Sequence, residues 1–461
     1  MQNYVKIPYP IKQGLKYIYS CIPIGYRYSK VFWDTYYFLQ KSQWWSREQL
    51  EEYQIQELKR LLKYSYEHVP YYRRVFDERY LKPEDIRSKQ DINELPILTK
   101  EIIRDNFNDL LAVNVDKSDL YLEKTSGTTV SPLTLYWQKS KTIHKEESFI
   151  WTIWNIAGYR FNEKRLDLTH LKLNNKLCEY DPLKRVMHIS ANSMNEDNLH
   201  IYVNLIREFQ PKVFKSIPSN LIILANYVLR KEIPIFPSIK LVICGSEMLY
   251  PWQKKRIEDA LQCRLFSFYG QTERVIIGTE CEINSQYHIF PEYGITEIID
   301  SDGLPIKLEG TLGKIVGTGF NNYAMPLIRY QVGDIASWCN EKCPCGRNYP
   351  LLQSIEGREN EYLVTNTGDL IPIIIIPYSS IMKNVKQFQF YQDTKGKAIL
   401  YIIPSPSFTQ DNAMSIINNL KKELRNIEVK LEYTDTIHRT KGGKYKYIIQ
   451  KLPIKFGDIS I

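Results

Sequence analysis

The stretch LVICGSEMLYPWQKKRIEDALQCRLFSFYGQTER, residues 241–274, indicates the fold class of this chain. Two apolar runs, LVIC and LFSF, have the length and composition of buried strands, and a helical segment, PWQKKRIEDAL, lies between them. Strands that alternate with helices favour an α/β domain. Each strand-like run ends before a loop, where α/β sheets present their ligand-binding groups. We therefore expect functional residues from Gly245 and from Tyr269 onward.

The pattern changes on the C-terminal side of this stretch. ITEIIDSDGLPIKLEG contains an Asp302-Gly303 turn between apolar runs, which predicts a hairpin, and KIVGTGF predicts a further strand. Beyond these, FQFYQ, AILYIIP and VKLEYTD predict strands, with a helix capped by Thr409 before the last of them. We therefore expect a large multi-sheet α/β N-terminal domain with a β-rich subdomain, residues 1–357, and a small mobile α+β C-terminal domain, residues 358–461.

The composition fits a folded enzyme. The 461 residues are 43% hydrophobic and 25% charged, near the averages of globular proteins. The net charge of +9 arises from 61 basic residues interleaved with 52 acidic ones. Because no long basic block is present, we expect no nucleic-acid partner. A local positive field is enough to bind a small polyanion such as ATP.

The N-terminal stretch MQNYVKIPYPIKQGLKYIYSCIPIGYRYSKVFW shows no signal peptide. Its apolar runs are broken every few residues, so nothing reaches the roughly 18 apolar residues of a spanning helix. We expect a cytoplasmic protein whose N-terminal arm packs on its own domain. Peripheral contact with a membrane surface is the alternative for this arm.

Two motifs carry nucleotide-binding chemistry. In EKTSGTTVSPL, residues 123–133, small and hydroxyl residues can offer backbone N–H groups and hydroxyls to phosphate oxygens, although such a stretch alone is more often a simple turn. In FYGQTER, residues 268–274, the Tyr269 ring can stack on a purine and Glu273 can hold a magnesium ion that bridges phosphates. A strand-end turn with a solvated glutamate is an equal interpretation of the second motif.

Three later segments add charged anchors. In RYQVGDIA, residues 329–336, the Asp334 carboxylate suits the two hydroxyls of a ribose. GREN follows at residues 357–360, and RTKGGK closes the series at residues 439–444. Lys444 could neutralise the charge that develops when a carboxylate attacks an α-phosphate, but alone it would be one of many surface lysines.

The order TSGTT, YGQTE, QVGD, GR and RTKGGK resembles the adenylate-forming enzymes, which include acyl-CoA synthetases, luciferases and nonribosomal peptide adenylation domains. The resemblance covers about residues 90–450. Within that superfamily the chain is most similar to the phenylacetate-CoA ligase group, and in it to the capsule-biosynthesis branch called CapK. The marks of this branch are YPIKQGL, QWWSREQLEEYQ, VPYYR and CPCGR.

The resemblance implies a role for each matching position. The phosphate loop would hold the β- and γ-phosphates, the Gly245-Ser246-Glu247 turn together with Tyr269 would frame the adenine, and Asp334 would take the ribose. Glu273 would bind magnesium, and Arg358 would approach the ribose or the phosphates. Lys444 would bridge the α-phosphate and the attacking carboxylate, and Lys444, Glu273 and Thr128 would be the catalytic residues. The remaining nucleotide-binding positions are Thr125, Ser126, Gly127, Thr128, Thr129, Gly245, Ser246, Glu247, Tyr269, Gly270 and Thr272.

Family members work in two halves, with the C-terminal domain rotating about a hinge that corresponds to Asn360. Three departures from the family pattern bear on activity. Val130 stands where the phosphate loop usually has glycine, and Asn360 and Glu361 follow the GR pair where an aspartate is usual. His438 and Gly442 replace a proline and a serine of the last motif. The charged anchors nevertheless all remain, so we expect an active enzyme.

Four residues form a candidate metal site: Cys281 and His288 before the hairpin, and Cys343 and Cys345 in CPCGR. Three thiolates and an imidazole suit zinc, although C-x-C is tighter than the usual spacing. Cys339 could replace Cys281 or His288, or these cysteines could be buried and reduced. Members of the resembled group carry a structural zinc in this arrangement, so we expect a closed structural site.

Taken together, the sequence predicts ATP-dependent adenylation of a small-molecule carboxylate, with release of pyrophosphate and transfer of the acyl group to an acceptor. The acceptor would be coenzyme A, a sugar amine or a carrier protein, in surface polysaccharide biosynthesis. A catalytically inactive nucleotide-binding scaffold of a polysaccharide assembly complex is the rival hypothesis. Trp151, Trp154 and residues 187–193 are our candidates for the acid pocket, which composition favours as apolar or aromatic. A homodimer is compatible with the sequence.

Overall fold

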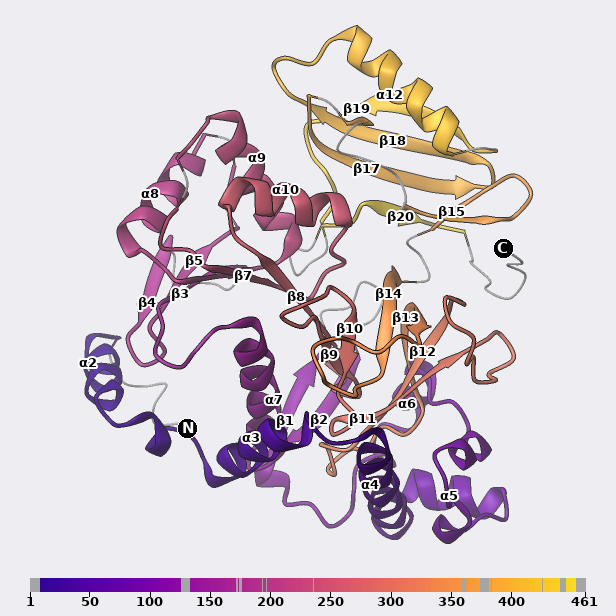
Figure 1. Cartoon of the computed structure of the whole chain (residues 1–461). Helices are drawn as coiled ribbons and strands as arrows, with labels where there is room; N and C mark the ends of the chain where they lie inside the picture. The colour runs from indigo at the N-terminus through magenta and orange to yellow at the C-terminus, as the bar shows by residue number, and fades with distance from the viewer. Residues whose placement is uncertain are drawn as a thin grey trace.

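The computed structural model contains a 12-stranded sheet, two two-stranded sheets and a four-stranded sheet within the described part of the chain. Figure 1 shows the four-stranded sheet and its helix stacked at one end of the large sheet, and the N-terminal helices at the other end. The prediction of an α/β fold is confirmed. The structure describes residues 9–125, 133–170, 173, 176–192, 194–195, 197–234, 236–358, 362–373, 381–382, 384–424, 426–439 and 445–452.

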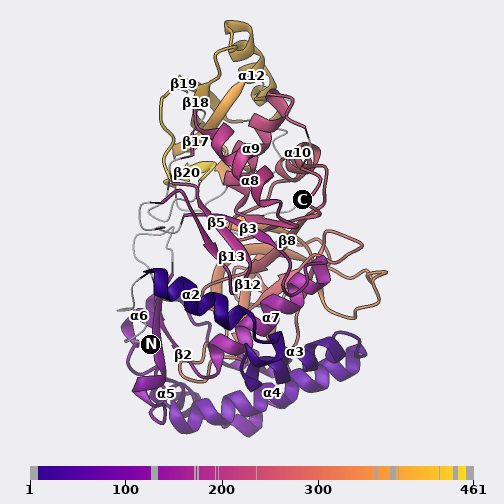
Figure 2. The same cartoon turned by 90° about the vertical axis from the view of Figure 1, so that its left-hand side faces the viewer.

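The N-terminal helices support one end of the large sheet (Figure 2). The longest of them begins after Ser46, whose hydroxyl accepts a hydrogen bond from the Gln49 N–H while the Gln49 side chain accepts from the Ser46 N–H, a complete capping box. This part contains α2 (Tyr9–Ser20), η1 (Ile24–Tyr26), α3 (Lys30–Ser42), α4 (Arg47–His68), α5 (Pro70–Glu78), η2 (Pro83–Asp85), η3 (Gln90–Glu94), α6 (Lys100–Asp105), η4 (Lys117–Asp119), the hairpin of β1 (Leu120–Lys124) and β2 (Thr134–Gln138), and α7 (Thr142–Ala157).

The N-terminal arm packs on the chain's own large sheet, as expected. The Lys16 ammonium lies 2.9 Å from the Asp181 carboxylate, and the Gln13 amide donates to Glu179. Arg27 donates to the carbonyl of Leu183. Across the described ranges, no helix is long and apolar enough to cross a lipid bilayer.

The stretch at 241–274 forms the centre of a parallel half-sheet. The predicted helix PWQKKRIEDAL is α10, with Pro251 as its first residue, where its missing N–H costs nothing. Strands β3, β5, β6, β7 and β8 pair in parallel, and β4 closes the edge antiparallel to β5. The elements are β3 (Arg165–Thr169), β4 (Cys178–Asp181), β5 (Val186–Ser190), α8 (Leu199–Phe209), β6 (Val213–Ser216), α9 (Pro218–Arg230), β7 (Leu241–Cys244), α10 (Pro251–Leu261) and β8 (Leu265–Gly270).

The other half of the large sheet is antiparallel. The predicted turn is present: the Gly303 N–H donates to the Asp300 carbonyl, and Gly303 has a φ of +81°. The run after this turn contributes only a bridge to Ile299, and residues from Gly313 onward form the paired strand. The strands are β9 (Ile277–Thr279), β10 (Tyr287–Ile289), β11 (Gly294–Ile299), β12 (Gly313–Gly319), β13 (Tyr330–Cys339) and β14 (Leu351–Arg358).

The C-terminal part has its own sheet and core. Its helix begins after Thr409, as predicted, because the Thr409 hydroxyl accepts from the Asn412 N–H. Ala413, Ile416 and Leu420 of this helix are buried against the sheet. The elements are β15 (Tyr362–Val364), β16 (Leu370–Pro372), β17 (Val385–Thr394), β18 (Lys397–Pro404), α12 (Gln410–Glu423), β19 (Glu428–Tyr433) and β20 (Ile448–Gln450), with the sheet ordered β19-β18-β17-β20.

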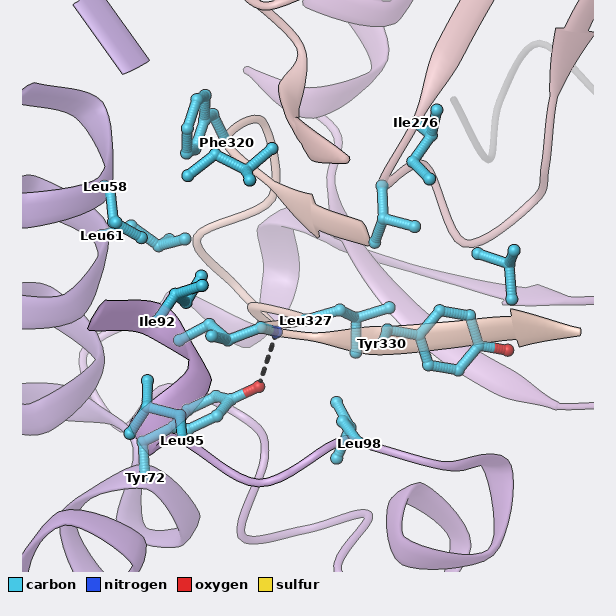
Figure 3. Packing of buried hydrophobic residues seen from close by; sticks show 14 of the residues in the cluster. Leu58, Leu61, Tyr72, Ile92, Leu95, Leu98, Ile276, Phe320, Leu327 and Tyr330 are labelled. Carbon is cyan, nitrogen blue, oxygen red and sulfur yellow. Dashed lines mark hydrogen bonds between the residues drawn. The ribbon is translucent and has the colours of Figure 1, made fainter. Parts of the chain in front are cut away.

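The main core joins the N-terminal helices to the antiparallel half-sheet (Figure 3). Leu58 and Leu61 of α4 point toward the segment that precedes β13. The buried Tyr72 hydroxyl donates to the Pro326 carbonyl at 3.0 Å and accepts from the Ile328 N–H at 2.9 Å. This network fixes the entry into β13, the strand that carries Asp334.

Candidate active site and metal centre

The candidate active site begins at the carboxyl ends of β7 and β8, as expected for an α/β sheet. The turn after β7 passes very close to β8: a Cβ on Gly245 would lie 2.9 Å from the Phe268 ring and 3.2 Å from its carbonyl oxygen. Only glycine fits this approach without a shift of β8. Ser246, next in the turn, has a φ of +69°. The turn after β7 and Tyr269 therefore lie side by side.

Tyr269 and Asp334 meet directly. The Tyr269 hydroxyl donates to Oδ2 of Asp334 at 2.7 Å, which joins β8 to β13. Asp334 also faces Arg358 across the β13–β14 pair. A carboxylate has about four acceptor positions, which suits this group to more than one donor, ribose hydroxyls included. The side chain of Arg358 lies outside what the structure describes.

Glu273 is buried, with 8% of its surface exposed, and its Oε1 accepts from the Tyr330 hydroxyl at 2.7 Å. The second carboxylate oxygen remains for another partner. A hard carboxylate oxygen held in this way is a suitable ligand for magnesium. Close by in sequence, both side-chain amide atoms of Gln271 are buried without a hydrogen-bond partner among the described residues. Sequence reasoning did not single out Gln271, since nothing in the motif marks it as buried.

Glu247 links the turn after β7 to the C-terminal part. Its carboxylate accepts from the Ser219 N–H at 3.0 Å and from the Ser219 hydroxyl at 3.1 Å. It also accepts from the Tyr445 N–H at 3.3 Å. The C-terminal part packs further along this edge, where the Gln253 amide donates to the Tyr447 hydroxyl at 2.6 Å. The residue that follows Lys444 is thereby brought to the candidate site.

The phosphate-loop candidate is described only at its ends. The Thr125 N–H donates to the Leu133 carbonyl at 2.8 Å, and the Thr125 hydroxyl accepts from the Leu133 N–H at 2.9 Å. These bonds close the base of the loop. The other predicted loop residues lie outside the described residues, as do Lys444, Asn360 and Glu361; the loop residues are Ser126, Gly127, Thr128, Thr129 and Val130.

A second polar group lies at the carboxyl ends of β3 and β5. Nδ1 of His170 lies 2.9 Å from Oδ1 of Asn192, and Nε2 lies 3.2 Å from Oδ1 of Asn220. Of the acid-pocket candidates, Asn192 belongs to residues 187–193 and lies here. Trp151 and Trp154 instead line a cavity with Arg165, at the opposite, amino end of β3.

The four predicted metal ligands converge, with their ligand atoms all within 4.8 Å of one another. The Cys281 and Cys343 sulfurs are 3.6 Å apart, and the Cys345 sulfur is 3.3 Å from Nε2 of His288. Burial, together with the Arg347 guanidinium, lowers the pKa of His288 to about 4, so that the ring is neutral at pH 7 and can act as a ligand. Two thiolates on one tetrahedral zinc are about 3.8 Å apart, so the donor set fits zinc.

Backbone and side-chain N–H groups already point at these sulfurs. The N–H groups of Ile283 and Asn284 donate to Cys281, and the Asn284 amide donates to Cys343 at 3.1 Å. Such donors stabilise thiolate charge. Cys339 lies in the same apolar cluster, but its sulfur accepts from the Gln286 amide at 3.1 Å and it is not among the four converging ligands.

Known proteins are similar to this chain in sequence and in fold. The family model described as CapK C-terminal domain matches residues 363–451. A phenylacetate-coenzyme A ligase of Thermus thermophilus is 28% identical over 334 residues, covering 71% of this chain and 74% of the relative. Protein CapK of Staphylococcus aureus is 23% identical over 463 residues, covering 95% of this chain and 100% of the relative. A 2-hydroxyisobutyryl-CoA ligase in its postadenylation state superposes with a TM-score of 0.72 at 20% identity, covering 89% of this chain and 93% of that one.

Together, the fold and these relatives define an adenylate-forming ligase. Within that superfamily, the chain is similar to the phenylacetate-CoA ligase and CapK group. It is thus an AMP-forming enzyme of the phenylacetate-CoA ligase type.

Proposed function

We propose that this enzyme uses ATP to convert a carboxylic acid into an acyl-adenylate, releases pyrophosphate, and then transfers the acyl group to coenzyme A or to an amine. The observation that carries this proposal is the meeting of Tyr269 with Asp334 at the carboxyl edge of the sheet, beside the turn that holds Tyr445. In support, a ring for the adenine, a carboxylate for the ribose and the backbone of Tyr445, the residue after Lys444, lie at one place.

In the proposed first half-reaction, a carboxylate oxygen of the acid attacks the α-phosphorus and the bond to pyrophosphate breaks. The loop from Thr125 to Thr129 would hold the β- and γ-phosphates, and the Gly245-Ser246-Glu247 turn with Gly270 and Thr272 would flank the adenine. Glu273 would hold a magnesium ion, which supplies positive charge to the phosphate oxygens. Lys444 would neutralise the charge that develops between the attacking acid and the α-phosphate. Positioning and charge neutralisation supply most of the catalysis in such a displacement.

We further propose that residues 358–461 form a small domain that rotates about Asn360 between the two half-reactions. In support, the C-terminal sheet has its own apolar core and meets the large domain chiefly through the turn after β7 and the start of α10. The 2-hydroxyisobutyryl-CoA ligase superposes with a TM-score of 0.72 in its postadenylation state and 0.60 in its thioesterification state. In this structure the Tyr445 backbone lies at Glu247, and rotation would withdraw it together with Lys444, its neighbour in sequence.

The proposal is tested by acid-dependent exchange. Labelled pyrophosphate is expected to enter ATP when the correct carboxylic acid is present and not in its absence, because exchange requires reversible formation of the acyl-adenylate. A panel of aliphatic, aromatic and hydroxylated acids, followed by product analysis with coenzyme A or amines, would identify the acid and tell a thioester from an amide. If no acid in the panel supports exchange, the inactive nucleotide-binding scaffold becomes the better hypothesis.

We propose that the acid pocket borders His170, Asn192 and Asn220. These three lie at the carboxyl ends of β3 and β5 and at the start of α9, and Ser219 joins that helix to Glu247. A polar border of this kind favours an acid with a hydroxyl or amide substituent over a purely apolar one.

Replacing His170 with leucine is expected to raise the KM for the acid about tenfold, since the ring's polar contacts with Asn192 and Asn220 are lost. The KM for ATP is expected to stay within about twofold, because the adenine and ribose contacts are separate. Initial-rate measurements of pyrophosphate release give both constants. His200→Leu, on the exposed face of α8, is the matched control. An equal rise in both KM values would remove His170 from the acid pocket.

The proposed biological role rests on a relative rather than on the geometry of the site. The Staphylococcus aureus relative that aligns over almost the whole chain is named CapK. We propose on this basis that the enzyme serves surface polysaccharide biosynthesis, with a sugar amine or a carrier protein as an alternative acceptor to coenzyme A.

A further inference from the structure

A cavity of about 460 Å³ lies between the N-terminal helical arm and α7, apart from the carboxyl edge of the sheet. Aromatic side chains form much of its wall. The rings of Trp151 and Phe161 are 4.0 Å apart, and Tyr28 lies 5.9 Å from Phe161. The Trp151 indole N–H donates to the Tyr28 hydroxyl at 3.1 Å, which fixes both rings. The wall is therefore a rigid aromatic surface suited to an apolar or cationic group.

Three arginines also line the cavity, and the donors of two of them are already used. Arg165 binds Asp167 through two bonds of 2.7 and 3.0 Å. Arg27 donates to three backbone carbonyls and to a side-chain amide. Arg274 stacks on the Trp137 indole ring, with Glu146 at 3.9 Å, and its Nη1 is buried without a hydrogen-bond partner among the described residues. Of these three groups, only Arg274 offers an anion a free hydrogen-bond donor among the described residues.

Two charged groups of the cavity have no such partner. Among the described residues, no hydrogen bond or ion pair reaches the carboxylate of Glu147, which is half-buried. Burial raises the pKa of Glu147, with Lys184 and His144 acting in the opposite direction. Lys184 stands on the exposed rim of the cavity, and no described side chain pairs with its ammonium. The cavity thus contains one half-buried carboxylate and, at its rim, one exposed ammonium, and neither is in a hydrogen bond or ion pair with a described residue.

We propose that this cavity binds a small zwitterion of the α-amino-acid type, with its ammonium on Glu147, its carboxylate toward Lys184 and an apolar or aromatic side chain on the Tyr28–Trp151–Phe161 wall. The ammonium satisfies a half-buried carboxylate that otherwise lacks a partner, which is the strongest single contact available. The aromatic rings add a cation–π contribution and apolar burial. This binding does not depend on the proposed adenylation chemistry.

Isothermal titration calorimetry of the full chain without ATP tests the proposal with three probes of one shape: L-phenylalanine, phenethylamine and 3-phenylpropionate. Affinity is expected to fall in that order, because the second probe lacks the carboxylate and the third lacks the ammonium. Glu147→Gln is expected to weaken the binding of L-phenylalanine and phenethylamine about 10- to 100-fold. Lys184→Met is expected to weaken the binding of L-phenylalanine alone. Glu208→Gln, an exposed change on α8, is the matched control.

The proposal is overturned if none of the three probes binds, if 3-phenylpropionate binds as tightly as L-phenylalanine, or if Glu147→Gln leaves the affinities unchanged. The order of the three affinities, measured on the unaltered protein, tests the proposal even if a variant fails to fold. Since no ATP is present, failure here is independent of whether the chain supports pyrophosphate exchange.

Discussion

Replacing Lys444 with alanine is expected to lower acid-dependent pyrophosphate exchange about 100- to 1,000-fold, the range for loss of one preorganised group that stabilises a developing charge. Lys444 lies outside the described residues, but its neighbour is placed: the Tyr445 N–H donates to Glu247 in the turn after β7. That turn is adjacent to Tyr269, whose hydroxyl bonds to Asp334. We therefore propose that a lysine one residue before Tyr445 reaches an α-phosphate held there.

The exchange assay needs a control that loses the same positive charge and keeps the fold. Lys451→Ala removes an exposed lysine seven positions later and is expected to retain exchange within about twofold. A second readout separates the half-reactions: starting from synthetic acyl-adenylate, Lys444→Ala is expected to transfer the acyl group at nearly the normal rate. If Lys444→Ala exchanges like the unaltered enzyme, another residue neutralises the charge. If it fails equally in both halves, the substitution has damaged the fold.

The local elements could be predicted where the sequence contains both a pattern and a boundary. Helix α10 coincides with PWQKKRIEDAL because a proline opens it and apolar strands flank it. Helix α12 begins after its capping threonine. Strands β9 and β10 have only three residues each, too few to show a period, and were not predicted. The order of the 12 strands depends on pairings between distant segments, which local patterns do not encode.

In the candidate site, too, single residues could be predicted from local motifs, whereas the contacts between distant residues could not. Tyr269 and Asp334 stand in separate motifs, and only the pairing of the strands brings their side chains to 2.7 Å. The trio of His170, Asn192 and Asn220 has no spacing that marks it, since each residue follows a different strand or opens a helix. No motif marks Trp151 and Trp154; they line a cavity with Arg165, the first residue of β3, and their place in the acid pocket stays a prediction.

The metal ligands lie far apart in sequence and meet because β10 pairs with β14. This pairing sets His288 opposite Leu351, six residues after Cys345, and so brings the CPCGR loop beside the segment that contains Cys281. We propose that the four residues hold one structural zinc ion. Four protein ligands leave no position for water, so the ion would stabilise the fold and take no part in the reaction.

Purified enzyme is expected to contain about one equivalent of zinc, and Cys345→Ser is expected to reduce this below about half an equivalent, because three ligands hold zinc much more weakly than four. Loss of the ion is expected to destabilise the large domain by about 4 kcal/mol, seen as a lower thermal midpoint, since the thiols and the ring are then buried without a partner. Emission spectrometry measures the metal, and thermal unfolding followed by circular dichroism measures the stability.

Cys339→Ser is the matched control, because it alters a cysteine of the same buried cluster that is not one of the four converging ligands. It is expected to keep its zinc and nearly all of its thermal stability. The opposite result, with zinc lost from Cys339→Ser and kept by Cys345→Ser, would move the site to a different set of ligands. A zinc content below about half an equivalent in the unaltered protein would remove the metal altogether, and burial, which raises the pKa of Cys343 to about 12, would then keep that thiol protonated.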